Sequence, residues 1–266
     1  ADDTFSESLN ATIGGATGDA SASGSFNLLA AQATDNSSLE VGLGAADTSV
    51  VGAKSGTATI SLESDGTGTS DIAGNVALAD QTVNVSGNVF RLAEASAHTP
   101  EPVDLGNIRQ GGSFATQALT IQNSAADDTF SESLNASIGG ATGDASASGS
   151  FNLLSAQATD NSSLEVGLGA ADTSVAGAKS GTATISLESD GTGTSDIAGN
   201  VALADQTVNV TGNVYQAAAG LLNTVASLNF GTLQVGQDVT AVDLSISNTA
   251  TGPLGFVEDM NANFGS

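Results

Sequence analysis

The feature that most constrains this chain is a long internal repeat. Residues 1–90 recur as residues 126–215, an offset of 125 positions, and only five substitutions separate the two copies. Each substitution exchanges side chains of similar shape: Thr12/Ser137, Ala30/Ser155, Val51/Ala176, Ser86/Thr211 and Phe90/Tyr215. A unit of about 125 residues has the size of a domain and is too long for one turn of a solenoid, so the repeat predicts successive copies of one domain.

A third copy begins late in the chain. Residues 228–233 align with residues 103–108 at the same offset, and residues 256–262 echo residues 130–136 after one inserted residue. Two explanations stay open: the chain is an excerpt of a longer polypeptide, or it is a processed subunit that receives its missing strands from a neighbour.

The repeat divides the chain into three parts. The expected parts are a first repeat without its opening strands, a complete repeat, and the opening strands of a third, over residues 1–97, 98–222 and 223–266. The opening strands of the first repeat are expected to come from preceding sequence or from a neighbouring chain.

Alternation with a period of two residues runs through each copy, and helical periodicity is almost absent. Strands are predicted at 103–108, 115–122, 130–138, 146–154, 163–168, 181–188 and 206–215. About seven short strands separated by turn residues are typical of an immunoglobulin-like β-sandwich. The predicted fold class is therefore all-β, with tandem immunoglobulin-like sandwiches of about seven strands each. Residues 91–102 contain Pro100 and Pro102 and are interpreted as an extended linker.

Charge and composition exclude several classes of function. The net charge is −25 with only 4 lysine and arginine residues, so binding to nucleic acid or to anionic lipid is not expected. No apolar run is long enough to span a bilayer, so no direct membrane insertion is predicted for this segment. The absence of cysteine removes disulfides, thiolate catalysis and zinc–thiolate sites together.

Three stretches in a fixed order carry a resemblance to a known family: residues 103–111, 118–123 and 206–215. In this order and spacing they resemble the bacterial choice-of-anchor D repeats, relatives of the Hydin-like (ASH) immunoglobulin-type domains. The resemblance implies a large secreted or cell-surface bacterial protein with many such domains and no catalytic residues. The third copy departs from the pattern where Gly252 and Pro253 replace the turn at Asp127 and Asp128.

The inventory of reactive side chains argues against an enzyme. A serine nucleophile needs a positioned base. The chain has a single histidine, His98, and the equivalent position of the next copy holds Asn223. Paired carboxylates for glycoside chemistry are possible in number, but the chain has no tryptophan and one tyrosine to form a sugar platform. Neither catalytic nor cofactor-binding residues are predicted.

Calcium is the one ion for which the sequence offers candidate ligands. The Gly/Thr/Ser/Asp loop at residues 63–71, repeated at 188–196, carries carboxylates and flexible carbonyls, the hard oxygen ligands that calcium prefers. The candidate metal ligands are Asp65, Asp71, Asp190 and Asp196. The loop lacks the dense alternating acids of an EF-hand, and runs of these residues are also ordinary turns.

Three hypotheses for function follow from these patterns. The leading one is a non-enzymatic structural repeat of an extracellular bacterial surface or biofilm-matrix filament, which associates with identical copies by strand complementation between subunits. The alternatives are the stalk of a giant adhesin and a calcium-stiffened binding module. Divalent cations bridging acidic faces and polysaccharide on the Thr/Ser-rich strand faces are the other expected partners.

Overall fold

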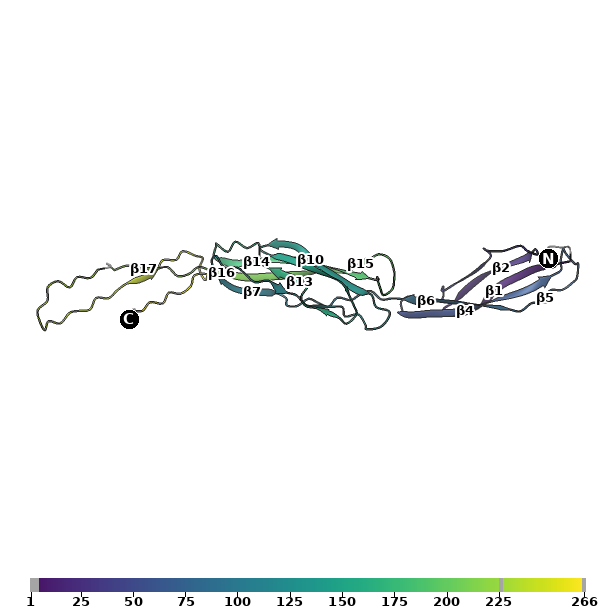
Figure 1. Cartoon of the computed structure of the whole chain (residues 1–266), viewed down its shortest axis with the longest axis horizontal. Helices are drawn as coiled ribbons and strands as arrows, with labels where there is room; N and C mark the ends of the chain where they lie inside the picture. The colour runs from purple at the N-terminus through teal and green to yellow at the C-terminus, as the bar shows by residue number, and fades with distance from the viewer. Residues whose placement is uncertain (1–4, 225–226, 265–266) are drawn as a thin grey trace. The chain divides into compact units, whose positions relative to one another are not determined.

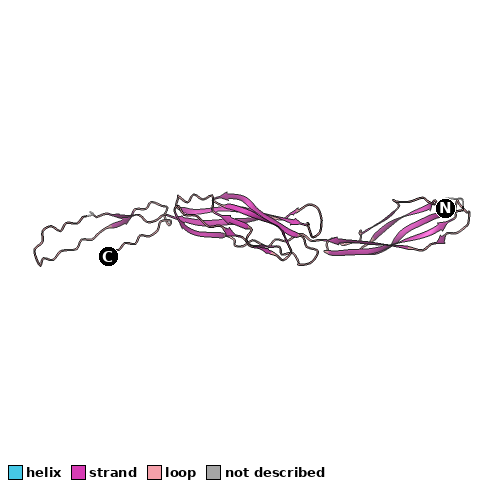
Figure 2. Cartoon of the chain, in the orientation of Figure 1, coloured by secondary structure: helices cyan, strands magenta, loops and turns pink. Residues whose placement is uncertain are grey.

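The computed structural model describes residues 5–224 and 227–264, and its regular elements there are all β-strands (Figures 1 and 2). The prediction of an all-β chain is therefore confirmed. None of the described residues forms a helix that could cross a membrane. The chain separates into two compact units, Ala1–Arg91 with Asp128–Phe130 and Leu92–Asp127 with Ser131–Ser266.

The first unit is one antiparallel sheet. Its strands follow the order β3-β2-β1-β4-β5, and β6 also pairs with β4. The bounds are β1 Ser8–Gly18, β2 Ser21–Leu29, β3 Leu39–Gly42, β4 Gly52–Asp65, β5 Val76–Ala77 and β6 Gln81–Val89.

The second unit contains the same strands and several more. Its main sheet follows the order β7-β16-β14-β10-β11-β13-β8, with β15 on β14, and β7 runs parallel to β16. Two further pairs are β12 with β9 and β17 with β18. The bounds are β7 Val103–Arg109, β8 Gln117–Ala118, β9 Ile121–Gln122, β10 Ser133–Gly143, β11 Ser146–Leu154, β12 Thr159–Asp160, β13 Leu164–Gly167, β14 Gly177–Asp190, β15 Val201–Ala202, β16 Gln206–Tyr215, β17 Gly220–Leu222 and β18 Ile246–Asn248.

The two units share the same strand register. β1 pairs with β2 through Leu9 and Leu29, and β10 pairs with β11 through Leu134 and Leu154, and both pairs carry a bulge one residue further on. At the bulge Leu153 adopts a φ of 56°, and the side-chain oxygen of Asn135 accepts a hydrogen bond from its amide at 2.7 Å. This bond stabilises a left-handed leucine, a conformation that β-branched or bulky residues otherwise avoid.

The core of the second unit is built from strands of its main sheet and from β9. Its fully enclosed side chains come from β7, β9, β10, β13, β14 and β16 and from Leu119 between β8 and β9. Val103, Leu119, Leu134, Ile185 and Val208 have no exposed surface. Among the described residues, every buried side-chain nitrogen or oxygen has a hydrogen-bond partner. Burial of these aliphatic residues is the main force that holds the unit together.

Residues 92–127, called the closing segment below, cover this core. Ala93 is 5% exposed and His98 is 6% exposed, and isolated bridges join Ala95 to Asn123 and Thr99 to Thr120. The interpretation of residues 91–102 as a linker is therefore wrong. The small and polar residues of this stretch are typical of a linker, but here they pack on the sheet. The predicted boundary after residue 97 lies inside the second unit.

The first unit has the same aliphatic residues in a different environment. Val41 is 40% exposed, whereas its equivalent Val166 is 1% exposed. Leu39, Ile60, Val83 and Val85 are half-buried, although their equivalents in the second unit are enclosed. We call the surface formed by these five residues the open face. Within the described residues of the first unit, no strand pairs with the outer edge of β6 as β7 pairs with β16.

Candidate functional site

The acidic turn that follows β4 holds the first pair of predicted metal ligands. Asp65 accepts hydrogen bonds from the amide of Thr67 and the side-chain amide of Asn10, both at 2.8 Å. The amide of Asp71 donates to the carbonyl of Gly66 at 3.0 Å, and the φ of Asp71 is 54°. These bonds close a tight turn, which explains why this loop is rich in Gly, Thr and Asp.

The second unit repeats this turn after β14. Asp190 accepts hydrogen bonds at 2.8 Å from the amide of Thr192 and from the side-chain amide of Asn135. The amide of Asp196 donates to the carbonyl of Gly191 at 3.0 Å, and its φ is 53°. The four predicted ligands therefore fall at equivalent points of two separate turns.

A glutamate that the sequence analysis missed closes each turn. Glu7 accepts hydrogen bonds from the hydroxyls of Ser64 at 2.7 Å and Ser70 at 2.8 Å. Glu132, which is 5% exposed, accepts the equivalent bonds from Ser189 at 2.8 Å and Ser195 at 2.7 Å. A Ser-Glu-Ser sequence at the start of a buried strand is the one signal that could have drawn attention to it.

These bonds favour the ionised carboxylates. The amide of Thr67, and then the side chain of Asn10, lower the pKa of Asp65. The amide of Thr192, then its hydroxyl and the side chain of Asn135, lower the pKa of Asp190. The hydroxyl of Ser64, followed by that of Ser70, lowers the pKa of Glu7. Hydrogen bonds to the charged form have this effect because they are lost or weakened on protonation.

The turns do not gather acidic groups as a metal site does. Over residues 5–224 and 227–264, no group of three or more histidine, cysteine, aspartate or glutamate side chains lies close enough to hold a metal ion. The oxygens of Asp65 and Asp190 are already used by protein donors. A calcium ion at these turns stays a prediction from the sequence.

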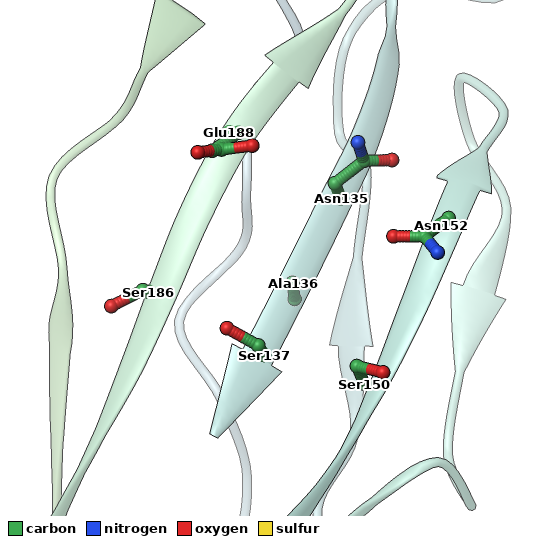
Figure 3. Close-up of a pocket in the computed structure, with 7 residues that line it drawn as sticks. All are labelled: Asn135, Ala136, Ser137, Ser150, Asn152, Ser186 and Glu188. Atoms are coloured by element: carbon green, nitrogen blue, oxygen red, sulfur yellow. The ribbon is translucent and has the colours of Figure 1, made fainter. Parts of the chain in front are cut away.

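A shallow polar groove of about 140 Å³ lies on the strands β10, β11 and β14 of the second unit (Figure 3). Its lining is Asn135, Ala136, Ser137, Ser150, Asn152, Ser186 and Glu188. Asn135 is held by Asp190 and by the amide of Leu153, and Glu188 accepts from Asn200 at 2.9 Å. The first unit has an equivalent groove of about 230 Å³ around Asn10 and Glu63. The hydroxyls, the amides and the Glu188 carboxylate of this lining can form hydrogen bonds with a polar ligand.

The single histidine of the chain, His98, lies in the closing segment and links it to β16. Its Nδ1 lies 2.8 Å from the side-chain oxygen of Gln206, and its Nε2 lies 2.9 Å from a carboxylate oxygen of Glu101. Burial raises the pKa of Glu101, but hydrogen bonds from Asn209 and His98 outweigh burial and lower it overall. His98 therefore ties the closing segment to β16, and none of these contacts involves a serine hydroxyl.

Asn123 is the central polar residue beneath the closing segment and has no exposed surface. Its side-chain oxygen accepts from the amides of Glu94 and Ala125, both at 3.2 Å. Its side-chain nitrogen donates to the carbonyls of Glu132 at 3.2 Å and Leu154 at 3.1 Å. All four hydrogen-bonding positions of the amide are satisfied, so this residue fixes how the segment meets β10 and β11.

Comparisons with known proteins give little further guidance. No family model matches the chain, and no curated protein matches it. Among solved structures, the cadherin-like domains 1 to 4 of zebrafish RET are similar at 8% sequence identity with a TM-score of 0.26. That match covers 77% of this chain, and the chain spans 41% of the length of that structure.

Proposed function

We propose that this chain is a non-enzymatic structural building block of an extracellular bacterial filament. In this proposal its repeats are tandem immunoglobulin-like β-sandwiches of about seven strands each, and copies of the chain associate with one another. The bacterial cell-surface setting is proposed from the resemblance of residues 103–111, 118–123 and 206–215 to choice-of-anchor D repeats.

One observation supports self-association above the others. The first unit presents an open face, and the chain also contains a second stretch with the pattern of the closing segment, in which Leu228, Leu244 and Ile246 are 39%, 40% and 45% exposed. The open face and this exposed apolar stretch are two different surfaces of one chain. If the stretch of one copy binds the open face of another, the contact is head-to-tail, and such contacts generate rings or open filaments.

The chemistry of the surface supports a structural role. The two polar grooves contain amides, hydroxyls and a single carboxylate each, with no histidine in either lining. The net charge of −25 keeps laterally adjacent chains apart and so favours growth at the ends.

Negative-stain electron microscopy of the purified chain tests this proposal. Filaments whose length increases with protein concentration are expected under native conditions. Dispersed single chains at all concentrations would contradict a filament-forming role. Immunogold labelling of intact producing cells tests the location, and label confined to the cell interior would contradict it.

A further inference from the structure

The equivalent surface of the second unit shows what fits the open face. There the closing segment adds Val103, Leu119 and Ile121 to the core, and these side chains are 0%, 0% and 1% exposed. The sheet residues beneath them, such as Val166 and Val210, become almost fully buried in turn. Since the first unit repeats this sheet with five substitutions over the shared residues, it needs a cover of the same pattern.

The chain carries such a cover at a second place. Residues 217–224 and 227–250, called the opening segment, stand at the same offset of 125 from residues 92–125. Leu228, Leu244 and Ile246 replace Val103, Leu119 and Ile121, so each apolar position is kept. Their exposed fractions of 39–45% show that the chain does not bury them as it buries their equivalents.

We propose that the opening segment of one copy binds the open face of a second copy, in the register by which the closing segment covers the second unit. This inference rests on the proposed function and names its partner as a second copy of this chain. The register follows from the parallel pairing of β7 with β16, where Val103, Asp104 and Asn107 pair with Val210, Thr211 and Asn213. The incoming strand therefore lies parallel to β6.

Three residue pairs define the contact. Leu228 of one copy lies beside Val85 of the other, Asn229 beside Ser86, and Thr232 beside Asn88. Val85 and Leu228 point into the new core, whereas Ser86 and Asn229 are exposed and their equivalents Thr211 and Asp104 are exposed in the second unit. A slip by one residue would turn Leu228 outward, so the apolar pattern selects this register.

A serine of the first unit is already oriented for the incoming backbone. In the second unit the amide of Ala93 donates to the hydroxyl of Ser189 at 2.7 Å, and that hydroxyl donates to Glu132 at 2.8 Å. In the first unit the hydroxyl of Ser64 donates to Glu7 at 2.7 Å. It therefore presents its lone pairs to the amide of Ala218 of the second copy, the equivalent of Ala93.

An asparagine of the opening segment is likewise arranged for docking. The side-chain oxygen of Asn248 accepts from the amides of Ala219 at 3.0 Å and Ala250 at 3.1 Å, which repeats the bonds that Asn123 makes with Glu94 and Ala125. Its side-chain nitrogen donates to the carbonyl of Glu258 at 3.2 Å. On docking this nitrogen takes the carbonyls of Glu7 and Leu29, the equivalents of the partners of Asn123.

Disulfide trapping tests the register, because the chain contains no cysteine of its own. Four full-length variants are made, Ser86→Cys, Asn88→Cys, Asn229→Cys and Thr232→Cys, and are mixed in pairs under mild oxidation. Matched pairs, 86 with 229 and 88 with 232, bring Cα atoms to about 5 Å, within the range that a disulfide spans. Crossed pairs, 86 with 232 and 88 with 229, use the same four proteins and are separated by a further ~7–10 Å along the strand.

The matched pairs are expected to form covalent dimers at least tenfold faster than the crossed pairs. Leu244→Asp in the Asn229→Cys chain should abolish the matched link, since its equivalent Leu119 has no exposed surface. Val235→Asp is the control on the same segment, because Val235 is 109% exposed and its equivalent Gln110 is exposed in the second unit. That substitution should leave the link intact.

The outcomes separate this inference from the proposed function. Filaments without a matched link, or equal rates for matched and crossed pairs, would overturn the docking register while the filament role stands. A matched link in closed rings or dimers that never extend would support the register and contradict the filament. No matched link in any preparation would overturn the docking proposal outright.

Discussion

Strands β4 and β14 consist of the same fourteen residues, yet they occupy different environments. Ile185 on β14 has no exposed surface, whereas Ile60 on β4 is only half-buried. Both strands pair with equivalent neighbours in equivalent registers, so strand formation does not depend on a finished core. The difference arises from the closing segment, which is present over one sheet and has no counterpart in the described residues of the other.

Some burial survives in the first unit without a cover. Ala11, Ala58 and Ile13 remain 2%, 0% and 5% exposed. These residues are shielded by their own sheet, while the larger aliphatic residues towards β3 and β6 are not. The comparison separates the part of the core that each sheet forms alone from the part that depends on a segment supplied to it. Four experiments test this distinction.

The largest effect is expected for the paired substitutions Leu119→Ala and Leu244→Ala. Leu119 is fully enclosed, so its truncation should lower the unfolding free energy of the second unit by about 3 kcal/mol. Leu244 is 40% exposed, and its truncation should cost less than about 0.5 kcal/mol in dilute protein. Hydrogen-exchange mass spectrometry measures the first effect in β14 and the second in residues 227–250. Equal losses from the two variants would mean that the two segments are not in different environments.

Asn123→Ala should have the next largest effect. It removes the side chain that satisfies two carbonyls and two amides beneath the closing segment, and a loss of about 2 kcal/mol is expected for the second unit. Asn248→Ala, the matched change, should leave dilute protein almost unaffected because Asn248 lies in an exposed setting. Urea unfolding monitored by circular dichroism checks the pair. A neutral Asn123→Ala variant would contradict the role given to this network.

Val166→Ala and Val41→Ala test the same position in the two sheets. Val166 is 1% exposed and Val41 is 40% exposed, so the first substitution should cost about 1.5 kcal/mol and the second less than half as much. Raising the protein concentration should enlarge the cost of Val41→Ala, because docking would bury that side chain. A cost that does not change with concentration would argue against occupation of the open face.

The smallest effect is expected on acidification. Since the folded-state pKa values of Asp65 and Asp190 lie below the usual value of 3.8, both carboxylates contribute stability that is complete above pH 5. The contribution falls as the pH drops through about 4 and below. The urea concentration at the unfolding midpoint should therefore be lower at pH 3 than at pH 6. The Asp190→Asn substitution should make this difference smaller for the second unit. A decline of unchanged size in that variant would assign the acid sensitivity to other groups.

The strands could be read from the sequence better than the site could. The predicted strands at 146–154 and 206–215 coincide with β11 and β16, because alternation and flanking turns define both. β14 runs beyond its prediction at 181–188 to Gly177–Asp190, since pairing with β16 and β10 carries Gly- and Ser-rich ends that have weak strand propensity.

Residues that act through burial were the hardest to predict. Glu132, His98 and Asn123 are buried although they are charged or polar. Sequence patterns assign Glu132 to a strand, His98 to a linker and Asn123 to the position after a strand, and none of them to the core. Their partners are distant in the chain, as in the contact of His98 with Gln206, and only the folded topology brings them together. The acidic turns were recognised, but their internal hydrogen bonds were not, because a turn and a calcium loop use the same residue types.

The parallel pairing of β7 with β16 also affects how the chain is made. Asn107 and Asn213 are hydrogen-bonded across this pair although 106 residues separate them. During synthesis residues 92–127 leave the ribosome long before β16 but after β6, which differs from the matching part of β16 only at Ser86. A strand edge of nearly the same sequence as β16 is therefore synthesised before β16 itself. The closing segment can complete its native pairing only after β16 has been synthesised, which slows folding. Because β6 and β16 are nearly identical, pairing with the wrong strand is favoured during this delay.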